Sequence, residues 1–298
     1  WKYLTYRLNS RSWSWPPLWR VTPRAAPPSP CVLCNPAVKF GLLRQRARAW
    51  GINYVATGHY AALVQTGPGQ GLSLVRAFDR TKDQTYFLSR LTPEILSQAV
   101  FPLAGLTKVR VREKAAALGL PAAAESREIC FLAGENYREF ILARLGPEAS
   151  EPGDFVDVKG RVVGRHKGLI NYTVGQRRGL NLPGPEPYYV LALDRIQNRV
   201  VLGTKEQTHS TRFTVADLVW SVSPPGPQFR ALVQIRSRHH PAPASVVLNP
   251  DRGAEVIFDQ PQPAITSGQA AAFYDRHLVL GGGWIDRTTF DIQPPGLV

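Results

Sequence analysis

The chain has 298 residues, of which 44% are hydrophobic and 19% are charged, and its formal net charge is +14. This length suits two or three domains with a sizeable core, and the composition excludes a largely disordered protein. No apolar run reaches the roughly 18 residues of a membrane span and the start lacks the layout of a secretory signal, so we expect a cytoplasmic protein without a membrane partner.

Positive charge is concentrated at the start of the chain. Ten of the 36 Lys and Arg residues precede Asp79, the first acidic residue. A basic segment of this kind attracts nucleic-acid phosphates through counterion release, although a disordered or foreign leader would have the same composition. Residues 1–30 hold four of the seven Trp and show no helical or alternating period, which favours an atypical, non-native leader. The chain has no Met and begins with Trp, so we also expect its natural start to be missing.

Regular patterns begin after this leader. Residues 36–50 have the spacing of a helix with Val38, Leu42 and Leu43 inward and the three arginines between 44 and 48 mostly outward. Residues 53–62 read as a strand that ends in a loop. Thr92-Pro93-Glu94 is a typical helix start, and the helix is expected to continue to about Val100.

Two more helices are predicted, from Thr107 to Leu118 and from Asn136 to Leu145. Strands interleaved with helices indicate an α/β domain that ends near residue 148. After Gly153 the pattern changes to short alternating stretches between Gly, Pro and Asp turns, at 188–193, 199–202, 231–235 and 244–248. We therefore divide the chain into a leader (1–30), an α/β domain (31–148), a central β domain (149–208) and a C-terminal β domain (209–298).

The cysteines offer several kinds of chemistry. Cys31 and Cys34 form a C-x-x-C motif directly before the first predicted helix, where the helix dipole lowers the pKa of a thiol. A zinc site would need further ligands, such as Cys130 and a histidine, and a thioredoxin-like site would need a preceding strand. Cys130, between Ile and Phe, also fits a buried small hydrophobic residue, and Cys34 fits a structural role equally well.

Polar residues next to predicted strands are the other candidates. Gly58 follows a strand and permits close approach of a ligand to the backbone, with His59 beside it. Lys82 and Gln84 suit contacts with phosphate and a base edge. Basic and polar clusters in the β half, at 175–179, 236–240 and 267–269, suit sugar-phosphate contacts. Each of these groups also fits a solvated turn or, for His59, a satisfied loop histidine.

Together the motifs resemble one family, the tRNA-specific 2-thiouridylases, which thiolate the wobble uridine of tRNA. The resemblance covers residues 31 to about 285, and its ordered blocks are CVLCNPAVKF, YVATGHYA, KDQTYFLSRL, FPLAGLTK, ESREICF, GRHKGLINYTVGQRRGL, PYYVLALD, SGQAAAFYD and LGGGWI. It implies an α/β plus β fold: an adenine-nucleotide α-hydrolase-like (PP-loop) domain, here incomplete, then a small central β domain and a C-terminal β-barrel.

The resemblance also implies a tRNA-uridine 2-sulfurtransferase that uses ATP with Mg²⁺, a persulfide donor supplied by a sulfur-relay protein, and no metal site of its own. Cys130 resembles the cysteine that carries the persulfide. Cys34 resembles the partner nucleophile, which releases the sulfur by forming a disulfide with Cys130. Gly58 resembles a glycine at the ATP site. The implied tRNA-contact residues are Ser29, Pro30, Cys31, His59, Lys82, Asp83, Gln84, Arg236, Ser237 and Gln269.

One departure from the family pattern bears on activity. Family members begin with a strand and a Ser-Gly-Gly-x-Asp-Ser loop that holds the ATP phosphates, and the leader does not resemble it. We therefore expect a truncated chain that lacks this loop, and the loss of the loop leaves both an active and an inactive chain open. The alternatives are a non-catalytic tRNA-binding fragment and a thiol-disulfide oxidoreductase that acts through Cys31 and Cys34.

Overall fold

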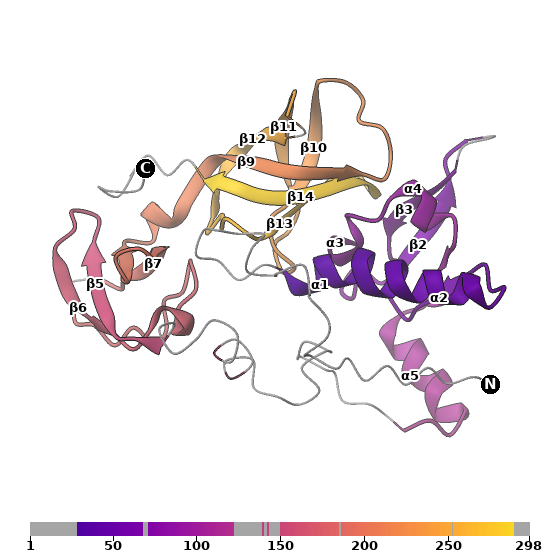
Figure 1. Cartoon of the computed structure of the whole chain (residues 1–298), viewed down its shortest axis with the longest axis horizontal. Coiled ribbons are helices and arrows are strands. Elements are labelled where there is room, and N and C mark those ends of the chain that lie inside the picture. Colours follow the sequence, from indigo (N-terminus) through magenta and orange to yellow (C-terminus); the bar gives the residue numbers. More distant parts are fainter. Residues whose placement is uncertain are drawn as a thin grey trace.

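The computed structural model describes residues 29–67, 71–121, 150–184, 186–251 and 253–288, together with positions 139 and 142 (Figure 1). The helical elements are α1 (Pro30–Cys34), η1 (Asn35–Leu42), α2 (Leu43–Ala49), α3 (Thr85–Leu88), α4 (Pro93–Leu96), α5 (Lys108–Ala117), η4 (Leu169–Asn171) and η5 (Glu206–Thr208). The strands are β1 (Val55–Ala56), β2 (Ala61–Gln65), β3 (Leu72–Arg76), β4 (Ala99–Val100), β5 (Gly153–Asp157), β6 (Val162–His166), β7 (Tyr189–Asp194), β8 (Arg199–Gly203), β9 (His209–Trp220), β10 (Gln228–Gln234), β11 (Ala242–Asn249), β12 (Gly253–Pro263), β13 (Ala270–Asp275) and β14 (Leu278–Thr288).

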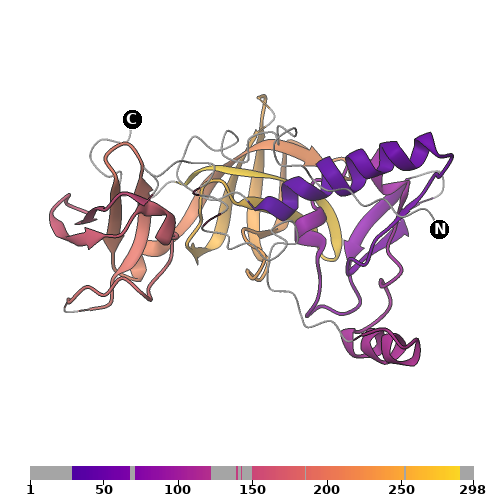
Figure 2. The ribbon, with the colours of Figure 1, turned by 60° about the horizontal axis from the view of Figure 1, so that its bottom comes forward.

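Helices α1, η1 and α2 form one continuous helix whose middle part is a π-helix (Figures 1 and 2). Pro36 has no N–H, so the α-helical hydrogen bond from this position is lost and its ring crowds the preceding turn. The wider π-turn relieves this crowding, and the backbone N–H of Leu43 bonds Val38, five residues back. A side chain at Gly41 would place its Cβ 2.6 Å from the Pro36 carbonyl oxygen, so glycine suits this position.

The π-helix changes which side chains face the core. Its turns hold more residues than α-helical turns, so the apolar face predicted from a 3.6-residue period moves out of phase. Val32, Phe40 and Ala47 are buried, whereas Leu43 is 40% exposed. The predicted inward position of Leu43 is therefore wrong, and Arg44, expected mostly outward, is largely covered and forms an ion pair with Glu94.

The rest of the first domain contains two separate sets of strands. β1 and β4 form a short parallel pair. Because Ala99 and Val100 belong to β4, the helix predicted to continue to about Val100 ends at Leu96 instead. The Thr92 hydroxyl accepts a hydrogen bond from the Ile95 N–H, which confirms the predicted helix start. The single strand predicted at 53–62 is two strands, β1 and β2, separated by the loop around Gly58. The β2–β3 hairpin extends the barrel sheet through the pairing of β3 with β14.

The two β units follow the alternation of the sequence. The central unit is a four-stranded sheet in the order β6-β5-β8-β7, with a core that includes Phe155, Val190 and Leu202. In the C-terminal unit, strands β13, β10, β11, β12, β9 and β14 are neighbours in that order, and β13 also pairs with β14. This last pairing closes the sheet into a six-stranded barrel and confirms the expected barrel fold.

The first domain and the barrel share one hydrophobic core. Its members come from the long helix and α3 (Val32, Phe40, Leu88) and from β13 and β14 (Tyr274, Trp284). Polar contacts reinforce this junction: the Ser221 hydroxyl donates to the Leu91 carbonyl oxygen at 2.8 Å, and the Arg90 guanidinium lies 4.8 Å from the centre of the Trp284 ring. The position of α3 is thus set by the barrel.

Three expectations fall wholly or mostly outside the described residues: the leader 1–30, of which only 29 and 30 are described, the helix 136–145, of which only positions 139 and 142 are described, and Cys130. Helix α5 confirms the prediction for 107–118, with Thr107 as its cap. Within the described ranges, no helix is long and apolar enough to cross a membrane.

The glycine triplet of β14 allows α3 to approach the barrel closely, so replacing Gly282 with Ala is expected to destabilise the protein by about 1 to 3 kcal/mol through overpacking. The added Cβ would lie 2.6 Å from the Ser89 Oγ and 3.0 Å from the Ala271 carbonyl oxygen. Gly105→Ala is the matched control, because a Cβ there meets no heavy atom within 4 Å. Urea unfolding measures the difference, and equal midpoints for the two variants would contradict the assignment.

Candidate functional site

The C-x-x-C motif lies in the first helix. Helix α1 begins at Pro30, six residues earlier than the predicted start at Pro36. Pro30 occupies the first helical position, where its missing N–H costs nothing, and Ser29 is the cap residue. Cys31 is half-buried within the first turn, and Cys34 is buried at the last α-helical position before the π-helix. The cysteines therefore lie inside the helix rather than ahead of it.

Asn35 ties this helix to α3. Its side chain is 1% exposed, and its Nδ2 donates to the Phe87 carbonyl oxygen at 2.9 Å. No hydrogen-bond partner for its Oδ1 is present among the described residues. Because Asn35 follows Cys34 directly, this hydrogen bond also fixes the position of Cys34 relative to α3.

The start of α1 meets the barrel at two of the predicted tRNA-contact residues. The Ser29 hydroxyl donates to the Gln269 Oε1 at 3.4 Å, across 240 residues of sequence. Tyr86, from α3, lies beside them and donates its hydroxyl to the Ala270 carbonyl oxygen at 3.0 Å. Burial raises the pKa of Tyr86 to about 12, against the opposing effects of the Ser29 hydroxyl and the Arg236 charge. Ser29 and Gln269 thereby meet next to Tyr86.

Gly58 and His59 lie in the loop after β1, at the carboxyl end of the parallel β1–β4 pair. Nucleotides bind at this end of parallel strands in open α/β sheets. Gly58 is exposed, and a Cβ there would meet only the Leu103 Cδ1, at 3.9 Å. The loop therefore leaves room for a ligand next to the backbone of Gly58.

His59 is a buried, neutral histidine. Its ring packs against Phe40 and Phe101, and its Nδ1 shares a 2.8 Å hydrogen bond with the Thr57 hydroxyl. Burial, with help from the positive charge of Lys39, lowers the pKa of His59 to about 4. At neutral pH its ring therefore carries no charge for a phosphate.

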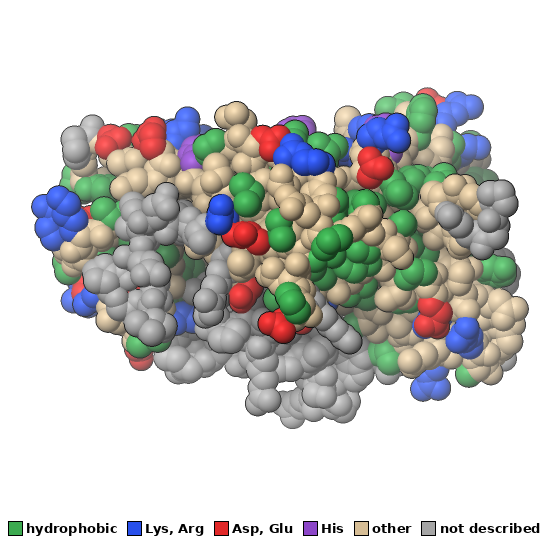
Figure 3. Space-filling view, turned by 90° about the horizontal axis from the view of Figure 1, so that it is seen from above, with side chains coloured by type: hydrophobic (Ala, Val, Ile, Leu, Met, Phe, Trp, Pro, Cys, Tyr) green, Lys and Arg blue, Asp and Glu red, His purple; other side chains and the backbone are tan. Residues whose placement is uncertain are grey.

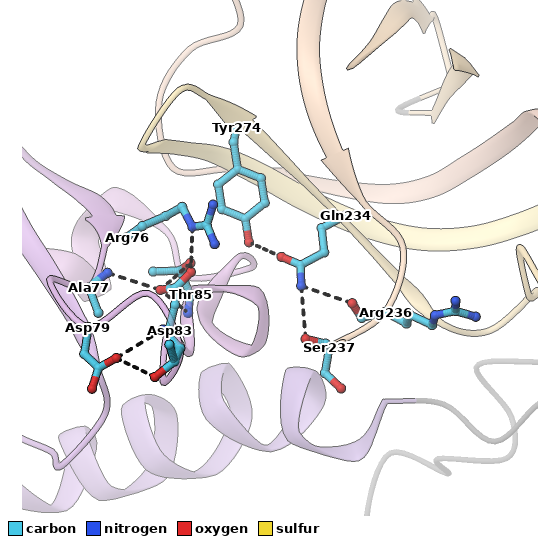
Figure 4. Close-up of polar contacts among 10 residues, drawn as sticks. Arg76, Ala77, Asp79, Asp83, Thr85, Gln234, Arg236, Ser237 and Tyr274 are labelled. Atoms are coloured by element: carbon cyan, nitrogen blue, oxygen red, sulfur yellow. Dashed lines mark hydrogen bonds and ion pairs between the residues drawn. The ribbon is translucent and has the colours of Figure 1, made fainter. Parts of the chain in front are cut away.

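Asp83 and Gln84 of the Lys82-Asp83-Gln84 segment are held by internal contacts, and Figure 4 shows those of Asp83. The Asp83 carboxylate, 6% exposed, accepts hydrogen bonds from the Arg76 Nε at 2.8 Å and from the Thr85 hydroxyl at 3.0 Å. The Gln84 Oε1 accepts from the Tyr60 N–H at 2.9 Å, and the Gln84 N–H donates to the Tyr60 carbonyl oxygen. The side chains of Asp83 and Gln84 thus form hydrogen bonds within the protein.

The Arg236-Ser237 segment forms a turn after β10. Beneath it, the buried Gln234 Nε2 donates to the carbonyl oxygens of Arg236 at 3.1 Å and Ser237 at 3.2 Å. The Tyr274 hydroxyl donates to the Gln234 Oε1 at 3.0 Å (Figure 4). Arg236 is half-buried and Ser237 is exposed, so the turn faces outward.

Charges on the described surface are mixed. On the face in Figure 3, Lys and Arg side chains lie apart, with Asp and Glu side chains between them. Two arginines of the basic start, Arg44 and Arg76, are paired with Glu94 and Asp83. The predicted electrostatic attraction is therefore reduced at these two positions.

Sequence reasoning missed four residues that build this site: Arg76, Tyr86, Gln234 and Tyr274. Tyr86 stands inside the KDQTYFLSRL block, which was a usable signal. Tyr274 likewise stands inside the SGQAAAFYD block. Arg76 and Gln234 lie on ordinary strands outside the blocks, and nothing in the sequence distinguishes them from surface or core positions.

Three family models match consecutive parts of this chain. A tRNA methyl transferase HUP domain matches residues 22–134, a tRNA methyl transferase PRC-barrel domain matches 138–204, and an aminomethyltransferase beta-barrel domain matches 210–285. The chain is therefore a three-domain protein with a HUP-type α/β domain, a central PRC-barrel domain and a C-terminal β-barrel.

Relatives named tRNA-specific 2-thiouridylase MnmA are similar along most of this chain. The protein from Chloroflexus aurantiacus is 48% identical over 263 residues, which cover 87% of this chain and 73% of the relative. The one from Desulforudis audaxviator is 46% identical over 87% of this chain and 75% of its own length. A third, tRNA-specific 2-thiouridylase MnmA 2 from Syntrophus aciditrophicus, is 40% identical over 88% of this chain and 83% of its own length. This chain belongs to the family of tRNA-specific 2-thiouridylases.

The lowered pKa of His59 predicts a dependence of stability on pH. In the unfolded chain His59 binds a proton below about pH 6.5, whereas in the folded protein it does so only below about pH 4. As the pH falls through this window, the free energy of unfolding of the wild type should therefore decrease by on the order of 3 kcal/mol. A His59→Gln variant lacks this titration, and its stability deficit at pH 7 should shrink as the pH falls to 4. Urea unfolding between pH 7.5 and 4 tests this, and parallel curves for the two proteins would exclude it.

Proposed function

We propose that this protein takes part in the ATP-dependent 2-thiolation of the wobble uridine of tRNA. The observation that carries the proposal is the hydrogen bond between Ser29 and Gln269, which sets the C-x-x-C helix against the barrel. Two predicted tRNA-contact residues thereby lie beside Cys31. The names of the relatives support the same reaction.

The proposed sulfur chemistry uses two cysteines. The Cys34 thiolate attacks the Cys130 sulfur of a Cys130 persulfide, the sulfur–sulfur bond of the persulfide breaks, and hydrosulfide is released while the two cysteines become a disulfide. The hydrosulfide replaces the oxygen at C2 of the uracil ring, and an external dithiol reduces the disulfide. The burial of Cys34 supports this role, because a sheltered thiol lets released sulfur meet the base before water dilutes it.

ATP would supply the adenylyl group that makes the uracil oxygen a good leaving group. The loop at Gly58 fits a nucleotide, because it follows a parallel strand and leaves open space at its backbone. The predicted lack of a glycine-rich phosphate loop stays a prediction, as do the sulfur-relay partner, Mg²⁺ and the domain limits 31–148, 149–208 and 209–298.

His59 and Asp83 are assigned supporting tasks in this proposal. A neutral His59 suits packing or hydrogen bonding and not charge neutralisation. The Asp83 carboxylate, covered by Arg76 and Thr85, suits holding the loop in shape. Lys82 is then the member of this segment whose charge is suited to the phosphate backbone.

The reaction can be tested directly. The purified chain is mixed with ATP, a persulfide donor and an unmodified tRNA transcript with uridine at the wobble position, and the nucleosides are analysed by mass spectrometry. We expect 2-thiouridine if the chain is catalytic. Binding of the transcript without 2-thiouridine would support the alternative, a non-catalytic tRNA-binding chain, and would exclude turnover by this polypeptide.

Exchange of the cysteines separates their roles. In a thiolation-competent protein, Cys34→Ser and Cys130→Ser should each abolish 2-thiouridine formation, because each removes a sulfur atom that the exchange requires. Cys31→Asp should retain thiolation, since an acidic group in the first turn suits the positive end of the helix. If Cys31→Asp lost thiolation as completely as Cys34→Ser, the two thiols of the C-x-x-C motif would have to act as a pair.

Gly58→Ala tests the proposed nucleotide contact. The added methyl group has space in the protein, so the unfolding midpoint should not change. If ATP approaches this backbone closely, the methyl group should weaken ATP binding by about tenfold, through loss of roughly 1.4 kcal/mol. Calorimetric titration with ATP measures this, with Gly105→Ala as the control. Equal ATP affinities for wild type and Gly58→Ala, or no ATP binding by the wild type, would remove Gly58 from the site.

A further inference from the structure

The turn at Arg236 and Ser237 is supported from below by a single buried amide. The Gln234 side chain is 6% exposed, and its Nε2 donates one hydrogen bond to each of the two turn carbonyls. A glutamine amide has two N–H donors, so both are used. The His239 N–H also bonds the Arg236 carbonyl oxygen, which completes a tight turn. The backbone that carries Arg236 is therefore fixed by Gln234.

Tyr274 determines which way this amide faces. Strands β10 and β13 are antiparallel with Leu232 opposite Tyr274, so Gln234 is the diagonal neighbour of Tyr274 on the same face. The buried Tyr274 hydroxyl donates to the Gln234 Oε1. Burial raises the pKa of Tyr274 far above its ordinary value, so the hydroxyl keeps its proton and remains a donor. If the Gln234 amide were flipped, its NH2 group would face the Tyr274 hydroxyl donor, and its oxygen would face the carbonyl oxygens of Arg236 and Ser237.

The other side of Tyr274 faces the first domain. The Arg76 guanidinium lies 5.7 Å from the centre of the Tyr274 ring, and its Nε donates to the Asp83 carboxylate (Figure 4). Asp83 also accepts the Ala77 N–H at 3.2 Å, which closes the loop on β3. A continuous chain of contacts thus runs from Asp83 through Arg76, Tyr274 and Gln234 to the turn at Arg236.

We propose that Tyr274 and Gln234 are positioning residues for tRNA binding, which hold the turn at Arg236 and Ser237 in a fixed place relative to the loop at 82–84. This inference rests on the proposed function, because it takes both segments as contacts with tRNA. The two residues need not touch RNA themselves. They set the spacing between two segments that lie about 150 residues apart in the sequence.

Two conservative variants test the proposal. Tyr274→Phe removes only the donor hydroxyl, and Gln234→Glu replaces the two donors with an acceptor that repels the turn carbonyls. Each should raise the Kd for an unmodified tRNA transcript with a wobble uridine by about threefold to tenfold, the loss of one or two modest hydrogen bonds. Tyr172→Phe is the matched control, because it removes a hydroxyl that bonds the Lys167 N–H in the central domain. It should bind the transcript as the wild type does.

A salt titration and a double-mutant cycle distinguish positioning from simple stabilisation. If Arg236 loses its phosphate contact, the slope of log Kd against log salt should fall by about one in Tyr274→Phe, as in Arg236→Ala. Adding Tyr274→Phe to Arg236→Ala should then cause little further loss. Melting curves of all variants are recorded alongside, to show that each is folded at the assay temperature.

The outcomes separate this inference from the proposed function. If the wild type binds the transcript and the two variants bind it with unchanged Kd and unchanged salt slope, the positioning role is wrong while tRNA binding stands. Fully additive losses in the double mutant would also overturn it. If the wild type itself does not bind the transcript, the proposed function fails and the inference fails with it.

Discussion

The packing of α3 against the barrel is the interaction on which the site depends. Ser89 lies close to Gly282 of β14, and this approach lets Leu88 join Tyr274 and Trp284 in the shared core. This core fixes α3, and α3 in turn fixes the long helix through the bond from Asn35 to Phe87. The cysteine motif is therefore positioned by a domain that begins about 175 residues later in the chain.

Asp83 and His59 have hydrogen-bond partners inside the protein, and these contacts decide what the two side chains can offer to a ligand. Asp83 is surrounded by donors, so its charge is balanced before any RNA approaches. His59 stays neutral because its surroundings are aromatic and apolar. An isolated buried charge would be costly, and these arrangements avoid it. The result is a frame that carries the half-buried Lys82 and Arg236 and the exposed Ser237.

Sequence alone predicted the parts of the fold that depend on local pattern. Alternation found the strands near 189–194, 199–203, 228–234 and 242–249, and the caps Thr92 and Thr107 marked two helix starts. It failed where a distant contact overrides the local pattern. Pro36 was taken as a helix start, whereas tertiary packing keeps it inside a helix and a π-turn absorbs the misfit. The β2–β3 hairpin looks like part of an α/β sheet, but its partner β14 lies 200 residues away.

In the candidate site, too, sequence found some residues and missed others, and the reason is the pairing register of strands β10 and β13. Cys34 stands out by residue type and by its family block, and Arg236 stands out as part of the basic cluster at 236–240. The turn at Arg236 is held by Gln234 and Tyr274, and this role arises only because β10 and β13 pair with Leu232 opposite Tyr274. A shift of one residue in that pairing would turn the Tyr274 hydroxyl to the other face and leave the Gln234 oxygen unpaired. The strand register is thus as much a part of the site as the residues that face the ligand.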